Sequence, residues 1–129
     1  MKTGRISDLP PSTVKSSRTG EVFTLTRFLT EGTSITDFSV THETLSPGRR
    51  SSSPHFHSHK DELYLVLEGA PTVHYHGKQR LLSAGDFVVF ESGSQHAHYL
   101  SNDTTSPVQL LMIASCPEKD DVHYRHSEI

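Results

Sequence analysis

Short segments of alternating or continuous apolar residues, separated by turn-forming residues, run along most of the chain. Residues 21–29 (EVFTLTRFL) alternate in polarity, and residues 34–45 are rich in β-branched side chains. Further strand-length segments fall at 62–68, 72–76, 79–82, 87–90, 95–101 and 108–115, with glycine, proline or asparagine in the intervening turns. No window combines an apolar repeat of 3.6 residues with helix caps. The pattern predicts an all-β fold whose short strands form a sandwich or a closed barrel.

The two ends of the chain are more polar than its middle. Residues 1–20 are rich in Ser, Thr, Lys, Pro and Gly, so we expect an extended N-terminal arm that is either disordered or packed on a partner subunit. Residues 21–115 are expected to form the barrel domain, and residues 116–129 a polar C-terminal tail. The length of 129 residues suits one domain, and no repeat, linker or fused helix-turn-helix segment is present.

Composition and charge exclude several classes of partner. The formal net charge is −3, which provides neither a basic footprint for nucleic acid nor a polybasic membrane patch. The N-terminal residues lack the apolar run of a signal peptide, and no segment has the length of a membrane-spanning helix. Cys116 is the only cysteine, so no intrachain disulfide can form. A cytoplasmic protein in a reducing compartment is therefore expected.

Histidines are the most informative residues of the chain. There are ten of them, and eight lie between His42 and His98. His55 and His57 are two residues apart, so on a strand both side chains point to one face. Imidazole nitrogens together with a carboxylate, here that of Glu62, are ordinary ligands of a catalytic divalent metal. His96 is distant in the sequence and needs the fold to bring it close to the others.

Two blocks of the sequence resemble the paired motifs of the cupin family. The first runs from Gly48 through His55, His57 and Glu62 to Gly69, and the second runs from Gly85 to His96. Three positions depart from the family pattern. Six residues, where the pattern has five, separate Gly48 from His55; Glu91 replaces a proline, and Leu100 replaces an asparagine.

The resemblance implies a fold, a ligand set and an assembly. The implied fold is a double-stranded β-helix, or jelly-roll barrel, in a small single-domain microbial cupin. Its four metal ligands would be His55, His57, Glu62 and His96. They would hold one divalent ion per chain, with Fe, Mn, Ni, Co and Zn all compatible with nitrogen and oxygen donors. Cupins are often homodimers, and pairing would also cover the edges and apolar outer faces of a small barrel.

Two further residues are candidates for a role beside the metal. His98 follows His96 by two positions and therefore shares its face of the strand. It is expected either to support the metal ligands or to form the wall of the pocket, from which it could orient the substrate. Tyr64 follows Glu62 by two and is either a core aromatic or a residue that orients the substrate. Glu62 is itself a candidate base, because a carboxylate ligand can accept a proton from a bound substrate.

The remaining histidines have no assigned role. His59 is expected at the surface, and His74 and His76 share one face of a strand that is expected to point to solvent. A role in the pocket stays open for these two and for His42, which lies on the strand that leads into the first motif.

Three functions are compatible with these residues. The first is a metal-dependent enzyme for a small molecule. The resemblance suggests a dioxygenase that acts on enol or diketone-like compounds, or an isomerase or lyase. The second is a non-catalytic binder or sensor of a small molecule, and the third is a structural or storage protein. Three histidines and a glutamate are costly to bury together without a metal, which argues against the third function.

Overall fold

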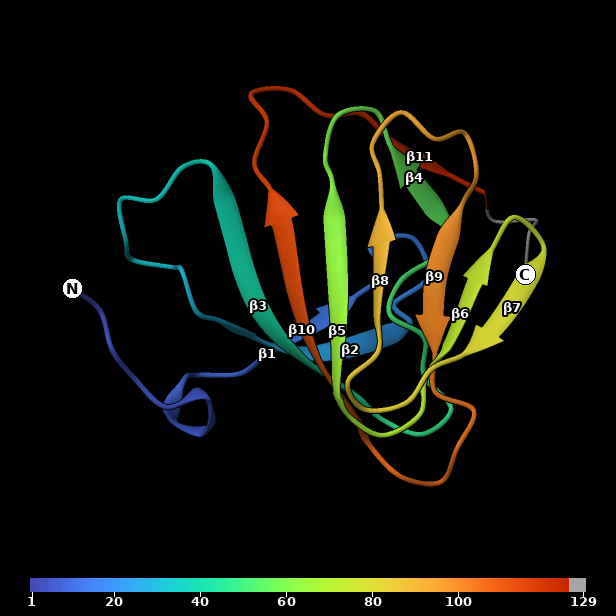
Figure 1. Ribbon diagram of the computed structural model, residues 1–129, viewed down its shortest axis with the longest axis horizontal. Helices are drawn as coiled ribbons and strands as arrows, with labels where there is room; N and C mark the ends of the chain where they lie inside the picture. The colour runs from blue at the N-terminus through green and yellow to red at the C-terminus, as the bar shows by residue number, and fades with distance from the viewer. Residues whose placement is uncertain (126–129) are drawn as a thin grey trace.

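The computed structural model describes residues 1–125, which form two antiparallel β-sheets facing each other (Figure 1). The first sheet has six strands, in the order β1 (Ser12–Lys15), β2 (Val22–Phe28), β3 (Phe38–Leu45), β10 (Val108–Ser115), β5 (Glu62–Glu68) and β8 (Phe87–Phe90). The second sheet has five strands, in the order β11 (Val122–Tyr124), β4 (His55–His57), β9 (His98–Ser101), β6 (Thr72–Tyr75) and β7 (Lys78–Leu81). A short 3-10 helix, η1 (Ile6–Asp8), precedes β1.

The core lies between the two sheets and follows the alternation of the strands. Along β5, Glu62, Tyr64 and Val66 point inward and are buried, whereas the residues between them are more exposed. Leu100 of β9 and Leu110 of β10 belong to opposite sheets, and both side chains are fully buried. The expected double-stranded β-helix of the cupin type is thus confirmed.

Both ends of the chain contribute a strand. In the expected N-terminal arm, Ser12–Lys15 form β1, which pairs with β2. In the expected polar tail, Val122–Tyr124 form β11, which pairs with β4 and places Val122 opposite His57. The C-terminal segment is therefore part of the second sheet and reaches the histidine pair.

The strand expected at residues 95–101 begins three residues later. Residues 91–97 form a loop, and β9 starts at His98, which is paired with His55 of β4 and with Tyr75 of β6. Asn102 ends the strand and is fully buried. Its side-chain amide donates hydrogen bonds to the carbonyl oxygens of Leu45 (2.9 Å) and Ser106 (2.8 Å), which fixes this end of β9 against β3.

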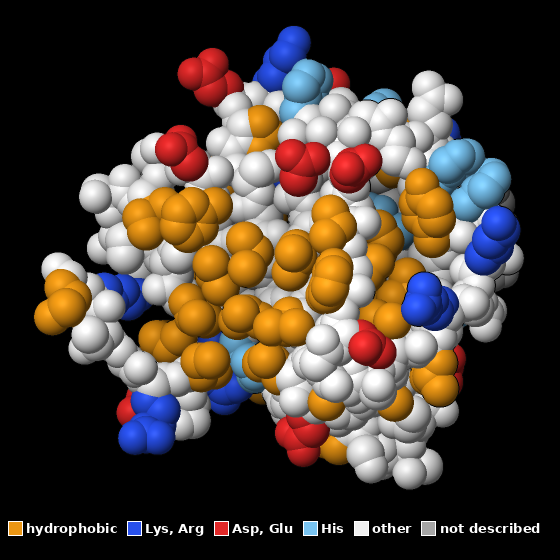
Figure 2. Space-filling view, viewed as in Figure 1, with side chains coloured by type: hydrophobic (Ala, Val, Ile, Leu, Met, Phe, Trp, Pro, Cys, Tyr) orange, Lys and Arg blue, Asp and Glu red, His pale blue; other side chains and the backbone are white. Residues whose placement is uncertain are grey.

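The outer face of the first sheet is apolar. Figure 2 shows hydrophobic side chains gathered across the face that carries β3, β10, β5 and β8. Phe38, Phe87, Val89 and Ile113 are all more than a third exposed. No helix within residues 1–125 is long and apolar enough to cross a membrane.

Candidate metal centre

Four side chains from both sheets converge inside the barrel. Glu62 extends from β5 of the first sheet, and the three imidazoles come from β4 and β9 of the second. The Nε2 atoms lie 3.1 Å (His98), 3.2 Å (His57) and 3.8 Å (His55) from Glu62 Oε1. His55, Glu62 and His98 each offer a ligand atom within 4.8 Å of the other two. All four residues are at least nine-tenths buried.

Two of the imidazoles are oriented by contacts on their other nitrogen. His55 Nδ1 donates a hydrogen bond to the Ser53 carbonyl (2.8 Å). His57 Nδ1 donates to Asp120 Oδ2 (2.6 Å). A proton on Nδ1 leaves the lone pair on Nε2, so both rings present an acceptor toward Glu62.

The centre fits a divalent metal ion. Two ligand atoms about 2.1 Å from one ion are about 3.0 Å apart at a right angle and about 4.2 Å apart when opposite. The distances from Glu62 Oε1 to the three Nε2 atoms, 3.1 to 3.8 Å, fall in that interval. The Nε2 lone pairs of His55 and His57 face the Glu62 carboxylate, an arrangement that a cation between them would stabilise. His55, Glu62 and His98, whose ligand atoms lie within 4.8 Å of one another, therefore suit an ion held by nitrogen and oxygen. His57 lies 3.2 Å from Glu62 Oε1 but is not in that group.

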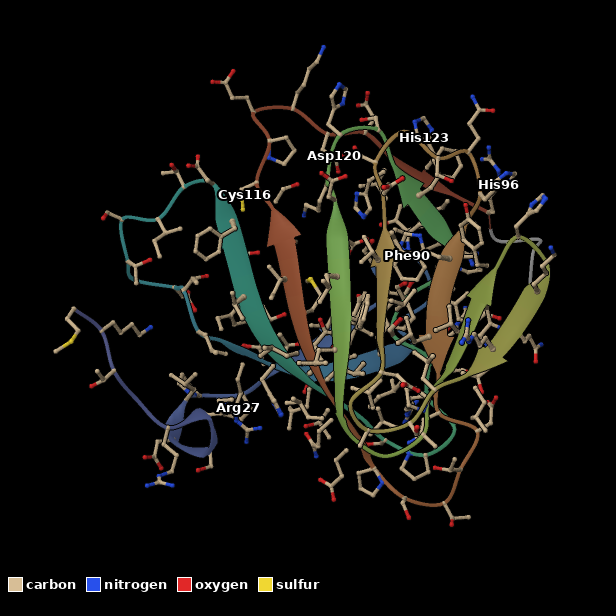
Figure 3. All side chains as sticks on the ribbon, viewed as in Figure 1. Arg27, Phe90, His96, Cys116, Asp120 and His123 are labelled. Atoms are coloured by element: carbon tan, nitrogen blue, oxygen red, sulfur yellow. The ribbon has the colours of Figure 1, made fainter. Side chains whose placement is uncertain are left out.

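The structure places His98, and not His96, beside Glu62. His96 is exposed in the loop before β9, and its ring lies 3.7 Å from that of His76 and 5.7 Å from that of Tyr75. Figure 3 shows it at the edge of the molecule, away from Phe90 in the interior. The reason is that β9 begins at His98. His96 therefore lies in the preceding loop and is not held on the inward face of a strand. The expectation that His96 joins the other three side chains is thus corrected.

The sequence contains a signal for this correction. The second motif expects an asparagine four residues after its histidine, and Leu100 occupies that place when His96 is counted as the ligand. Counted from His98, the place falls on Asn102, whose buried amide secures the end of β9. The motif therefore fits this chain two residues later, with a longer loop before the histidine.

Asp120 is a site residue that the sequence did not suggest. It comes just before β11, and besides accepting from His57 it accepts hydrogen bonds from the backbone N–H groups of His59 (2.8 Å) and Lys60 (2.9 Å). Burial raises the pKa of Asp120, but these three donors outweigh burial and lower it to about 2. Asp120 is thus ionised and holds both the ring of His57 and the turn that follows it.

The electrostatics of the centre depend on Glu62. Burial alone would raise its pKa, yet the three imidazoles hold that pKa well below its usual range. Burial also lowers the pKa of His98, and His55 and His57 reinforce this effect. For His57, burial lowers the pKa, but the neighbouring carboxylates of Glu62 and Asp120 outweigh burial and raise it. The carboxylate is therefore ionised at neutral pH, as a ligand must be.

A cavity of about 570 Å³ opens onto the centre between β8 and the β6–β7 hairpin. His57 and His98 line it, together with Val73, Tyr75, Val88 and Phe90. The ring of Phe90 is stacked on His98, with centroids 3.7 Å apart and an interplanar angle of 5°. Phe90 thus fixes the plane of one imidazole and forms the apolar wall beside it.

The other candidate residues lie outside the centre. Tyr64 is buried in the hydrophobic core, edge-on to Phe90, and does not line the cavity. His59 and His76 are exposed. His74 is stacked on Tyr99 (4.2 Å) and bonded to Ser101 Oγ (2.7 Å) on the outer side of its sheet. His42 is buried on the outer face of the first sheet, opposite Leu111.

A comparison with protein families agrees with this geometry. A family model described as "Cupin domain" matches residues 41–114, which is more than half of the chain. The chain belongs to the cupin family. The matched segment contains all four converging side chains, whereas Asp120 lies beyond it. No curated protein sequence matched this cupin.

Solved structures show the same fold. A cupin-superfamily sugar phosphate isomerase from Silicibacter pomeroyi has a TM-score of 0.87 at 22% identity, covering 96% of this chain and 82% of that one. A predicted oxalate decarboxylase from Thermotoga maritima has a TM-score of 0.76 at 23% identity, covering 90% and 100%. A protein from Acidithiobacillus ferrooxidans, provisionally named a sugar phosphate isomerase, has a TM-score of 0.74 at 28% identity. This cupin covers 65% of that chain, which in turn matches 80% of this one.

Proposed function

We propose that this cupin is a metal-dependent enzyme that acts on a small molecule. One divalent ion per chain would be held by His55, His57, Glu62 and His98, with Fe, Mn, Ni, Co and Zn all compatible with the donors. The observation that supports this proposal is the approach of three Nε2 atoms to a single Glu62 oxygen inside a buried centre. The adjoining cavity of about 570 Å³ is large enough to admit a small molecule.

The reaction class we favour is an oxidation by dioxygen of an enol or diketone-like compound. A bound ion with positions left open supplies Lewis acidity and a place for small ligands. The protein itself would supply an apolar, water-poor wall through Phe90 and Val88 and a buried, ionised carboxylate at Glu62. We propose that Glu62 Oε accepts the proton that an enolisable substrate gives up. Tyr64 has no part in this proposal, because it lies behind Phe90 in the core.

An isomerase is the second candidate, favoured by the 28% identity to the Acidithiobacillus protein. The same centre serves it, since isomerisation of a carbonyl compound also begins with proton removal next to the carbonyl group. A lyase that begins in the same way belongs with this candidate. Dioxygen separates the two classes, because only the oxidation consumes it.

A substrate screen with defined metal forms tests the proposal. The protein would be loaded separately with Fe(II), Mn(II), Ni(II) and Zn(II) and mixed with a panel of 1,3-diketones, enols and α-hydroxy ketones. Metal-dependent oxygen uptake supports the oxygenase, and exchange of substrate protons into D₂O without oxygen uptake supports the isomerase or lyase. Binding without turnover in every metal form would contradict an enzyme and favour a sensor.

We also propose that the protein is a homodimer. The apolar outer face of the first sheet, formed by Phe38, Phe87, Val89 and Ile113 among others, is the surface that a second copy would cover. On the same face, between Arg27 and Leu111, His42 Nδ1 is buried without a hydrogen-bond partner among residues 1–125. A twofold contact places the same patch on both sides of the interface, so an apolar face suffices for both partners.

A further inference from the structure

The mouth of the cavity carries an excess of positive charge. Lys60, Lys78 and Arg80 line it, and Glu91 is the one acidic residue among its lining residues. Lys78 and Arg80 lie on the same face of β7, where they are paired across the hairpin with Tyr75 and Val73. The two cations therefore continue the inner face of the hairpin outward from the apolar wall.

These three cations have no partner within the described part of the chain. No carboxylate lies within 4.0 Å of the Lys60, Lys78 or Arg80 side chain in residues 1–125, and none of these side chains donates a hydrogen bond there. By contrast, Arg50 forms a two-point contact with Glu21 at 2.8 Å. Three unpaired cations beside one carboxylate attract an anion at the mouth of a cavity whose walls are apolar.

We propose that the substrate is a small, largely apolar molecule with one anionic group, a carboxylate or a phosphate. This inference rests on the proposed function, because it takes the cavity above His57 and His98 as the substrate site. The apolar part would lie against Val73, Val88 and Phe90, and the anionic group would meet Lys78 and Arg80 at the mouth. A cationic ligand is disfavoured by the same charges, and a polyhydroxylated neutral ligand by the apolar wall.

Four probes with one apolar body test the charge preference. They are 3-phenylpropionate, 2-phenylethyl phosphate, 3-phenylpropanol and 3-phenylpropylamine. Their affinities for the zinc-loaded protein would be measured by calorimetry at low ionic strength. We expect an anion to bind most tightly, the alcohol more weakly and the amine weakest, with the preference shrinking as salt is added. The two anions distinguish a carboxylate site from a phosphate site.

A matched pair of variants locates the cause of the preference. The double variant K78Q/R80Q is expected to bind the preferred anion roughly five- to tenfold more weakly, because exposed charges contribute modestly to affinity. Its affinity for the neutral alcohol should not change. The control R5Q/K15Q has the same change in net charge, at two exposed cations that lie outside the cavity lining, and should bind like the wild type. A bound metal would attract anions equally in the wild type and in both variants. A difference in anion affinity among the three proteins therefore measures the effect of the cations at the mouth of the cavity.

Two results would overturn the inference. One is equal affinity of anion and alcohol in the wild-type protein, and the other is equal loss in the variant and its control. Zinc content measured in the same samples separates this inference from the proposed function. Retained zinc with no anion preference contradicts the inference alone. Absence of zinc with the preference intact contradicts the metal centre alone.

Discussion

Asp120 is the residue on which the orientation of His57 depends. Its carboxylate accepts from His57 Nδ1 at 2.6 Å and from two backbone N–H groups, so one side chain fixes the ligand and the turn beside it. Partners of this kind set the tautomer of a ligating histidine and contribute to metal affinity. Asp120, just before β11, therefore supports the proposed metal centre by orienting His57.

Substituting Asp120 by Asn should weaken metal binding by about tenfold or more, because a neutral amide holds the imidazole less strongly. Competition with a chromophoric chelator measures this affinity. The neighbouring Asp121 is exposed, and no contact of its side chain is present in residues 1–125, so D121N provides a matched control. Equal affinities for the two variants would show that Asp120 does not support the metal centre.

Glu43 introduces a dependence of stability on pH. It points into the barrel from β3, and its one hydrogen-bond partner within residues 1–125 is Thr41 Oγ1 at 3.3 Å. Burial, opposed by Thr41 and reinforced by the charge of Glu62, raises its pKa from 4.5 to about 7. Below pH 4.5 this carboxyl is neutral in both the folded and the unfolded state. As the pH rises from 4.5 to about 7 the unfolded chain loses the proton before the folded one does, so stability falls over that interval and is constant above it.

The variant E43Q should therefore be more stable than the wild type at pH 8, by about 2 to 3 kcal/mol in the free energy of unfolding. At pH 5 the difference should fall below about 1 kcal/mol, since the native carboxyl is then neutral. Urea unfolding of both proteins at pH 5 and pH 8 measures this difference in the free energy of unfolding. Other groups that titrate affect both proteins equally and cancel in the comparison. A difference independent of pH would show that Glu43 is not the titrating group.

The three first-motif residues of the site could be predicted, but the fourth could not be chosen by alternation. His55, His57 and Glu62 follow from spacing and strand parity. His96 and His98 have the same parity, so alternation does not distinguish them. The asparagine four residues after His98, Asn102, is the signal in the sequence that favours His98. Asp120 could not be predicted because it meets His57 from 63 residues away.

At the level of the elements, the turn between β5 and β6 is the most constrained. Gly69 has a φ of +87°, and a Cβ there would lie 2.7 Å from the Pro107 carbonyl oxygen and 2.9 Å from Val108 Cγ2. Both the backbone conformation and the close approach of the β10 start require glycine. This turn therefore packs directly against the start of β10.

Replacing Gly69 by Ala should lower the free energy of unfolding by about 2 to 4 kcal/mol, since positive φ and backbone overlap add. Gly20 has a similar φ of +76°, but a Cβ at that position would have no neighbouring atom within 4 Å. G20A is thus a control for the backbone conformation alone and should cost about 1 kcal/mol. Chemical denaturation of both variants measures the two contributions, and equal losses would refute the overlap.

The central strands could be predicted from sequence, whereas the terminal ones could not. Segments such as 62–68 and 108–115 have strong apolar patterns because their inward faces are buried. β1 and β11 are edge strands of four and three residues, all of them exposed, so burial imposes no pattern on them. They exist because they pair with β2 and β4, which is a property of the folded barrel.

For the whole molecule, the apolar outer face predicts association through the first sheet. The variant V89K/I113K places two charges in that face and should shift the protein to monomers in sedimentation velocity. Leu81 is 67% exposed on β7, at the far edge of the second sheet. L81K should therefore leave the dimer intact. A monomeric wild type at high micromolar concentration would contradict the dimer.

The proposed function depends on the metal centre, and one comparison of two variants tests that centre. After incubation with Zn(II) and removal of free ion, elemental analysis would give the metal content of H98A and H96A. We expect about one zinc per chain for the wild type and H96A, and at least a tenfold weaker binding for H98A. Zinc retained by H98A and lost from H96A would contradict the centre described here.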